Sequence, residues 1–325
     1  MSLLIKLKKL HKIPNKIYRS IERAFNKLHA YDYPDTADGW EKIGKNPVFG
    51  NEKTGSIFDP YVLKDKKKYI LFASERKSGS IIRLESINGK TWENKSICLN
   101  GGHFEWNAIV NRACVIKKDE IWHMWFTGQT NNNSTIGYAT SKDGIIFQPA
   151  LDKPVLKPLE IYEGDSVMNP CVLWDEKNKI YKMWYSAGED YEPDIICYAE
   201  SMDGISWCRY PEPVMRPNKN TKYSQYKLGG CDVKYINGKY IMFYIGYQNL
   251  DVARICKAIS TDGIHWCPSL NNPIISPTRN SWDADAIYKP SVIFEEKAQL
   301  MWYNGRHKRQ EYIGFAIHSI IQNKK

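Results

Sequence analysis

A ten-residue segment recurs along the chain at an almost constant interval. Residues 138–147 read YATSKDGIIF, residues 198–207 read YAESMDGISW, and residues 257–266 read KAISTDGIHW. A repeat period of forty to sixty residues is typical of propellers and solenoids. Each copy contains Asp-Gly, a tight-turn signal because both residues tolerate positive φ. The repeat therefore predicts hairpins placed at equivalent points of successive structural units.

Strand patterns surround each of these turns. An alternating strand precedes the Asp-Gly pair, and a more apolar strand lies further upstream. There are five such apolar segments: YILFAS, IWHMWFTG, YKMWYSAG, YIMFYIG and LMWYNG. A further strand opens each unit: FDPYV, NRACV, MNPCV, GGCDV and YKPSV. About four short antiparallel strands in each of five units predict an all-β, five-bladed β-propeller.

The fifth unit lacks its Asp-Gly strand, and the start of the chain supplies one. Asp38-Gly39-Trp40, followed by NPVF at 46–49, matches the pattern DGIHW…NNPII. We expect this N-terminal strand to complete the last blade, which removes the exposed sheet edge of an open array. Residues 32–325 are predicted to form the propeller, and residues 1–31 a short helical arm.

The arm carries most of the positive charge. Residues 1–30 contain six Lys and two Arg against Glu22, so they hold +7 of the net +10. A helical stripe of Ile17, Ile21, Phe25 and Leu28 among these cations suits an anionic membrane surface. Packing of the helix on the propeller or on a partner is the alternative. The nearly neutral remainder argues against nucleic-acid binding.

The cysteines and histidines bear on metal binding, and the charges of the N-terminal segment bear on the location of the protein. The eight Cys form no CxxC pair and the seven His show no ligand spacing, so no metal site and no cofactor are expected. Charges run through the N-terminal segment and interrupt any signal-peptide core. We expect a cytoplasmic protein, peripheral on the inner face of the membrane if the arm binds lipid.

The repeat and the Asp59-Pro60 pair resemble the five-bladed propeller glycosidase superfamily, over residues 38 to about 320. This superfamily includes arabinanases, β-xylosidases, invertases, levansucrases and β-mannoside phosphorylases. The resemblance implies an active site over the central channel with three carboxylates: a base or nucleophile from blade one, a stabilising Asp from blade two and an acid Glu from blade three. Asp59 matches the first, whereas Arg112 and Met168 stand where the others are expected.

Alignment of the five units places Asp59, Arg112, Asn169, Gly230 and Lys289 at equivalent inner positions. The predicted catalytic candidates are Asp59, Asp165, Asp232 and Asp285. The predicted substrate-binding residues are Arg76, Trp106, Arg112, Glu163, Asn169, Asp283, Lys289, Arg306 and His307. A purely structural ring, with Asp59 paired to Lys289 and Asp165 to Arg112, is the alternative.

The substitutions at the second and third carboxylate positions suggest a different reaction. A phosphate leaving group departs as a stable anion and needs cations rather than a general acid. We therefore expect glycosyl transfer from a phosphorylated sugar donor to a glycan acceptor, in polysaccharide assembly, with Asp59 as base. A glycoside hydrolase or phosphorylase of the same superfamily is one alternative, and a non-catalytic glycan-binding propeller is another.

Overall fold

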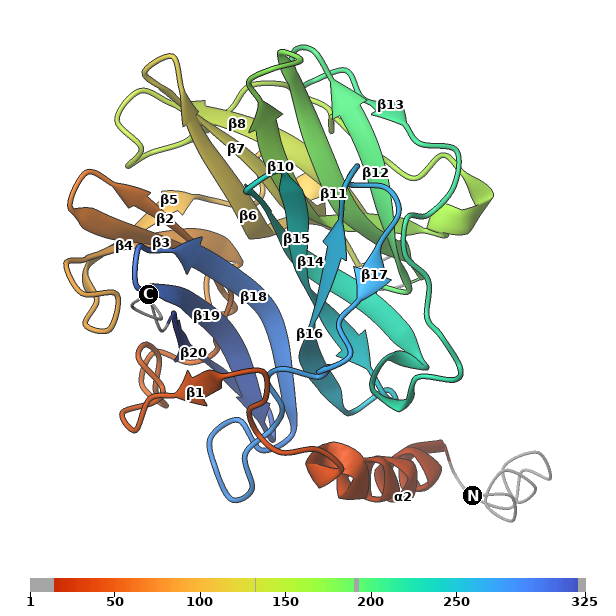
Figure 1. The fold of residues 1–325 in the computed structure, drawn as a ribbon. Coiled ribbons are helices and arrows are strands. Elements are labelled where there is room, and N and C mark those ends of the chain that lie inside the picture. The colour runs from red at the N-terminus through yellow and green to blue at the C-terminus, as the bar shows by residue number, and fades with distance from the viewer. Residues whose placement is uncertain (1–14, 132, 190–192, 321–325) are drawn as a thin grey trace, which may run out of the picture.

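The computed structural model describes residues 15–131, 133–189 and 193–320, and residues 1–14 of the predicted arm lie outside them. Five four-stranded antiparallel units are arranged in a ring (Figure 1). Their innermost strands contact one another in the closed order β2, β6, β10, β14, β18 and back to β2. One parallel bridge, Ser134 to Ser166, links the second unit to the third. The predicted all-β, five-bladed propeller is confirmed.

The bounds of the elements follow the chain. Blade one holds β2 (Ile57–Asp65), β3 (Lys68–Glu75), β4 (Ser80–Ser86) and β5 (Glu93–Leu99). Blade two holds β6 (Ile109–Lys118), β7 (Ile121–Gln129), β8 (Ser134–Ser141) and β9 (Gln148–Pro149). Blade three holds β10 (Ser166–Asp175), β11 (Ile180–Gly188), β12 (Ile195–Ser201) and β13 (Cys208–Arg209). Blade four holds β14 (Lys227–Ile236), β15 (Lys239–Tyr247), β16 (Ala253–Ser260) and β17 (Cys267–Pro268). Blade five holds β18 (Ala286–Phe294), β19 (Ala298–His307), β20 (Gln310–Ser319) and β1 (Trp40–Lys42). The helical elements are α2 (Asn15–Lys27), η1 (Leu28–Tyr31), η2 (Glu105–Asn107), η3 (Ile161–Glu163) and η4 (Lys222–Ser224).

The N-terminal strand closes the ring. β1 pairs antiparallel with β20, with Trp40 opposite His318. A second bridge joins Phe49 to Ile313. The last blade thus combines the two ends of the propeller sequence, as the Asp-Gly-Trp pattern predicts.

The Asp-Gly turns receive an indole N–H from the preceding blade. Trp125 of blade two donates to the carbonyl of Gly204 in blade three at 2.8 Å, and Trp184 of blade three donates to Gly263 in blade four at 2.8 Å. Gly263 has φ +83°, and a Cβ on it would lie 2.9 Å from the Trp184 ring. The recurring glycine is therefore required by both the turn and the close approach of the tryptophan.

Replacing Trp125 by Phe is expected to lower the free energy of unfolding by about 1–3 kcal/mol, because the buried carbonyl of Gly204 loses its donor. Urea unfolding followed by circular dichroism measures the change. Trp106→Phe is the matched control, since its indole N–H bonds an exposed carbonyl of Asp152 that water can solvate instead. Equal losses in the two variants would show that the interblade bond contributes nothing beyond the change in ring size.

Each innermost strand is interrupted by a β-bulge at the same place. The bulged residues are those that the sequence alignment made equivalent, and all have positive φ: Asp59 (52°), Arg112 (56°), Asn169 (55°), Gly230 (45°) and Lys289 (34°). Side chains of the preceding blade hold several of these backbones. Ser74, Thr127 and Ser186 accept from the N–H groups of Arg112, Asn169 and Gly230, respectively. Bulges re-aim side chains and are common beside active sites, so the sheet geometry itself directs Asp59, Arg112 and Asn169 toward the same end of the channel.

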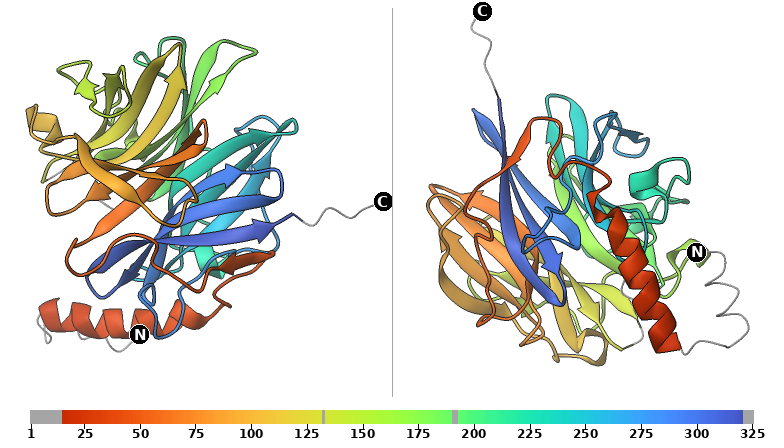
Figure 2. Two further views of the ribbon diagram at one scale, coloured as in Figure 1. Left: turned by 90° about the vertical axis from the view of Figure 1, so that its left-hand side faces the viewer. Right: turned by 90° about the horizontal axis from the view of Figure 1, so that it is seen from below.

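The helix α2 lies along the outside of the propeller (Figure 2). It contacts the loop between β15 and β16 through Asp251, and the start of blade five through Asp285. The predicted helical arm is present over the described residues, and no helix among them is long and apolar enough to cross a membrane.

Candidate functional site

A central pocket of about 390 Å³ opens at the end of the channel where the bulges lie. All five blades contribute to its wall. Its polar lining combines three carboxylates, three arginines and several amides that suit sugar hydroxyl groups. The lining residues used below are Asp59, Glu75, Arg76, Arg112, Asn169, Tyr288, Arg306 and Glu311.

Asp59 is the buried carboxyl of this pocket. Its Oδ2 lies 3.2 Å from Nε of Arg112, yet this oxygen accepts no hydrogen bond from the described residues. Burial raises the pKa of Asp59; Arg112 opposes the rise and Glu311 adds to it. Asp59 therefore holds a proton to higher pH than an ordinary aspartate, which is the property of a general acid. The alternative pairing of Asp59 with Lys289 and of Asp165 with Arg112 is corrected, since Arg112 pairs with Asp59.

Two further arginines line the wall. Arg76 makes a 2.7 Å ion pair with Glu311, and its guanidinium lies 4.7 Å from the centre of the Phe58 ring. Arg306 donates to the backbone carbonyl of Asp251 at 3.0 Å and lies 5.1 Å above the Tyr288 ring. These contacts hold planar cations at the pocket, where they suit bidentate capture of an oxyanion.

The other two carboxylates of the pocket are already engaged. Glu75 is ion-paired with Lys95 and accepts from Ser78 at 2.7 Å. Burial opposes ionisation of Glu75, but these hydrogen bonds outweigh it and keep its pKa below the usual range. Glu311 was not predicted from the sequence, because it lies near the start of β20, the third strand of blade five, and the repeats were aligned on their inner strands.

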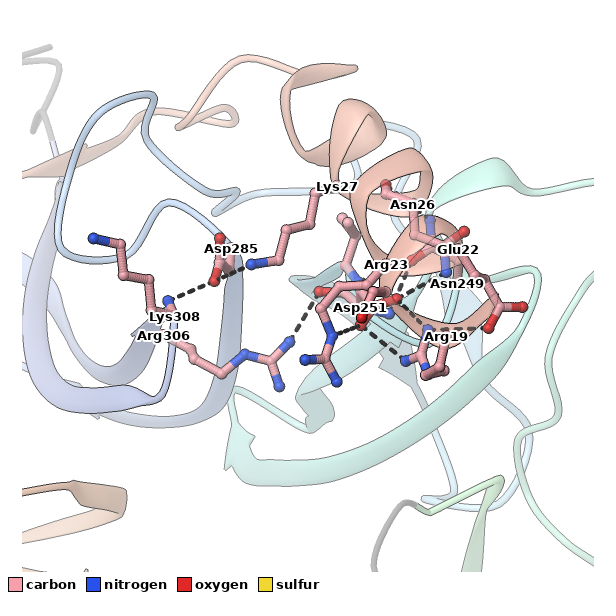
Figure 3. A network of polar contacts seen from close by, with 12 residues as sticks. Arg19, Glu22, Arg23, Asn26, Lys27, Asn249, Asp251, Asp285, Arg306 and Lys308 are labelled. Carbon is pink, nitrogen blue, oxygen red and sulfur yellow. Dashed lines mark hydrogen bonds and ion pairs between the residues drawn. The ribbon is translucent and has the colours of Figure 1, made fainter. Parts of the chain in front are cut away.

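A second hollow of about 510 Å³ adjoins the central pocket, and we call it the annex. Six basic residues and three acidic residues line it: Arg23, Lys27, Arg76, Arg306, Lys308, Arg309, Asp251, Asp285 and Glu311. It shares Arg76, Arg306 and Glu311 with the central pocket. Figure 3 shows part of its wall, where α2 faces the loops of blades four and five. The excess of positive charge makes this a favourable approach for anions.

Asp232 and Lys289 lie outside the central pocket lining. Asp232 accepts from the backbone N–H of Val292 at 2.6 Å and pairs with Lys234 at 3.0 Å. Lys289 donates to the backbone carbonyl of Cys231 at 2.9 Å. Both side chains are almost fully buried and join neighbouring blades. Their predicted catalytic and substrate-binding roles are replaced by structural ones.

Three of the predicted acidic site residues likewise lie outside both the central pocket and the annex. Glu163 is fully buried and pairs with Arg209 at 3.0 Å. Asp283 is buried and pairs with Lys42 at 2.7 Å. Asp165 is exposed and lines neither the central pocket nor the annex. Glu163 and Asp283 are therefore engaged in buried ion pairs away from the central pocket.

The remaining candidates lie at the edge of the site or away from it. Asp285 lines the annex and pairs with Lys27 at 2.7 Å, and His307 lies beside it at 3.6 Å. Trp106 stacks against Phe104 and Phe126 and lines neither hollow. Of the predicted residues, Asp59, Arg76, Arg112, Asn169 and Arg306 thus come together in the central pocket. Among the described residues no group of three or more His, Cys, Asp or Glu is placed to hold a metal ion.

Comparison with known proteins identifies relatives of this chain in sequence. No family model matches the chain. It is 33% identical over 209 residues to the 1,2-beta-oligomannan phosphorylase of Thermoanaerobacter sp., an alignment covering 61% of this chain and 64% of that protein. It is 28% identical over 243 residues to a beta-1,2-mannobiose phosphorylase of the same organism, covering 69% of this chain and 74% of the relative. The chain thus spans just under two thirds of the length of the first of these relatives.

A solved structure shows the same fold. A thermostable family-43 glycoside hydrolase superimposes with a TM-score of 0.68 at 20% identity, covering 87% of this chain and 94% of the other. The predicted resemblance to the five-bladed propeller glycosidase superfamily is confirmed.

Proposed function

We propose that the chain is a glycoside phosphorylase that cleaves β-linked mannosides with inorganic phosphate. The observation that carries this proposal is Asp59, a buried carboxyl with a raised pKa beside Arg112, in a pocket with two more arginines. The two phosphorylase relatives support the substrate class.

Phosphorolysis explains why one proton-carrying carboxyl suffices. Hydrolysis needs a second carboxylate to activate water or to attack the sugar. Phosphate is already an anion, so it needs cations to hold it rather than a base. Arg112 and Asn169 at the second and third bulges therefore fit this reaction, whereas a three-carboxylate set fits hydrolysis.

The bond changes can be assigned to the residues of the pocket. Asp59 donates its proton to the glycosidic oxygen, and the bond from that oxygen to the anomeric carbon breaks. A phosphate oxygen, held by Arg112 and Arg306, forms the new bond to the anomeric carbon. The products are a sugar 1-phosphate and a free hydroxyl on the shortened glycan.

The reverse reaction is glycosyl transfer from a phosphorylated sugar, with Asp59 as the base. This is the chemistry that the sequence suggested, but neither relative is named for polysaccharide assembly. We therefore favour the phosphorylase, which was an alternative at the sequence level, over a dedicated transferase.

A hydrolase is the second candidate, and Glu311 favours it as another carboxylate in the same pocket. Its 2.7 Å ion pair with Arg76 weakens it as a base, because the pair stabilises the ionised form. A non-catalytic propeller would bind glycans without turning them over.

Incubation of the full chain with β-1,2-mannobiose and phosphate is expected to yield mannose 1-phosphate. Omitting phosphate should abolish cleavage, because the attacking group is then missing. Chromatography with phosphate analysis measures both products. Release of free mannose without phosphate would establish the hydrolase, and binding without any product would establish the glycan-binding module.

A further inference from the structure

The helix α2 contacts the propeller through polar residues and Tyr18, and it turns its apolar stripe outward. The stripe residues are 52% (Ile17), 41% (Ile21), 42% (Phe25) and 71% (Leu28) exposed. A surface helix normally buries such a stripe against the core. The packing of the arm on the propeller, which the sequence left as an alternative, therefore occurs without covering the stripe.

Buried carboxylates fix this orientation. Asp251 is 4% exposed and accepts from Arg19 at 3.0 and 2.9 Å and from Asn26 at 2.8 Å (Figure 3). Arg23 adds an ion pair to Asp251 at 3.3 Å. Lys27 reaches the buried carboxylate of Asp285 at 2.7 Å. Rotating the stripe inward would break these contacts and leave the buried carboxylates of Asp251 and Asp285 without the cations of α2, which is costly.

The charge around the stripe indicates what covers it. α2 carries four basic residues and one acidic residue, and residues 1–14 add four lysines and no acidic residue. Arg19, Arg23 and Lys27 pair with Asp251 and Asp285, so the cations that remain to attract a surface are the exposed Lys16 and the four lysines of residues 1–14. An exposed apolar stripe preceded by cations suits the boundary between lipid headgroups and acyl chains. Each cation near an anionic leaflet also contributes attraction. A protein partner would instead need an apolar patch surrounded by acidic residues, and the sedimentation experiment below tests for one such partner, a second copy of this chain.

We propose that the outward face of α2 docks on a lipid bilayer that contains anionic lipid. The stripe enters the interface, while Arg19, Asn26 and Lys27 hold the helix to the propeller. This inference does not depend on the proposed phosphorylase activity.

Flotation of the full chain with vesicles tests the proposal. Wild-type protein is expected to float with vesicles of phosphatidylcholine mixed with phosphatidylglycerol, and much less with phosphatidylcholine alone. The double variant Ile21→Asp/Phe25→Asp should bind the mixed vesicles about tenfold more weakly or worse, because it removes apolar burial and adds negative charge. Binding by the wild type should also weaken with added salt.

The matched control is Ile87→Asp/Met202→Asp, which changes two residues that are 81% and 83% exposed in blades one and three. It should bind mixed vesicles like the wild type, and circular dichroism should show that both double variants are folded. Equal flotation of the two double variants, or no flotation of the wild type, would overturn the proposal. Sedimentation showing a wild-type dimer that only the stripe variant loses would assign the face to a second copy instead.

Discussion

Asp59→Asn is expected to lower kcat for phosphorolysis by about a hundredfold or more, because the amide cannot donate a proton to the leaving oxygen. The side chain keeps nearly the same shape in the bulge, so binding of β-1,2-mannobiose should change little. Initial rates of mannose 1-phosphate formation measure the effect. Asp165→Asn is the matched control, since Asp165 is exposed and lines neither hollow.

The pH profile identifies the role of the lost carboxyl. Because the pKa of Asp59 is raised, its acid form persists above the range of an ordinary aspartate, and kcat/KM should fall as pH rises through that pKa. The residual activity of the variant should lack this decline. The folded protein also loses stability as pH rises through the same pKa, so the Asn variant should be at least as stable at neutral pH. Full activity in the variant would show that another residue is the general acid, and Glu311 would be the next residue to test.

Arg112→Ala is expected to raise KM for phosphate by about ten- to a hundredfold, since it removes a charge-assisted contact worth about 1.5–3 kcal/mol. Arg112→Lys keeps the charge but loses the planar fork, so an intermediate KM is expected. Steady-state rates at varied phosphate and fixed glycan measure the change.

Arg216→Ala is the control for this series, because Arg216 is exposed and lies outside both hollows. A raised KM for the glycan with an unchanged KM for phosphate would show that Arg112 binds sugar. That result would leave Arg306 and Arg76 as the phosphate ligands to test.

Local repetition made the fold predictable. The Asp-Gly turn and its aromatic residue recur at fixed offsets, and each turn needs its glycine for a φ that few residues adopt. The same pattern at Asp38-Gly39-Trp40 predicted the closing strand, since a propeller leaves only one place for a spare outer strand. Equivalence of the inner strands also placed Asp59, Arg112 and Asn169 correctly in one pocket.

The partners of charged residues were not predictable in the same way. Glu163 and Asp283 look like pocket acids in the sequence, but Arg209 and Lys42 reach them from distant segments. The stripe of α2 is plain in the sequence, whereas its direction depends on Asp251, more than two hundred residues away. Ion pairs between distant segments determine where these side chains lie, and neither the periodicity nor the spacing of the sequence predicts such pairs.

The five bulges have a consequence for how a propeller of this kind can vary its site. Side chains of other residues, such as Ser74, Thr127 and Ser186, fasten the bulged backbones, so the scaffold does not require a particular side chain at most bulges. Three of the five bulges, those of Asp59, Arg112 and Asn169, place their side chains in the central pocket. Substitutions at the second and third bulges can therefore alter the polar lining of the pocket while the hydrogen bonds that fix the bulged backbones are kept.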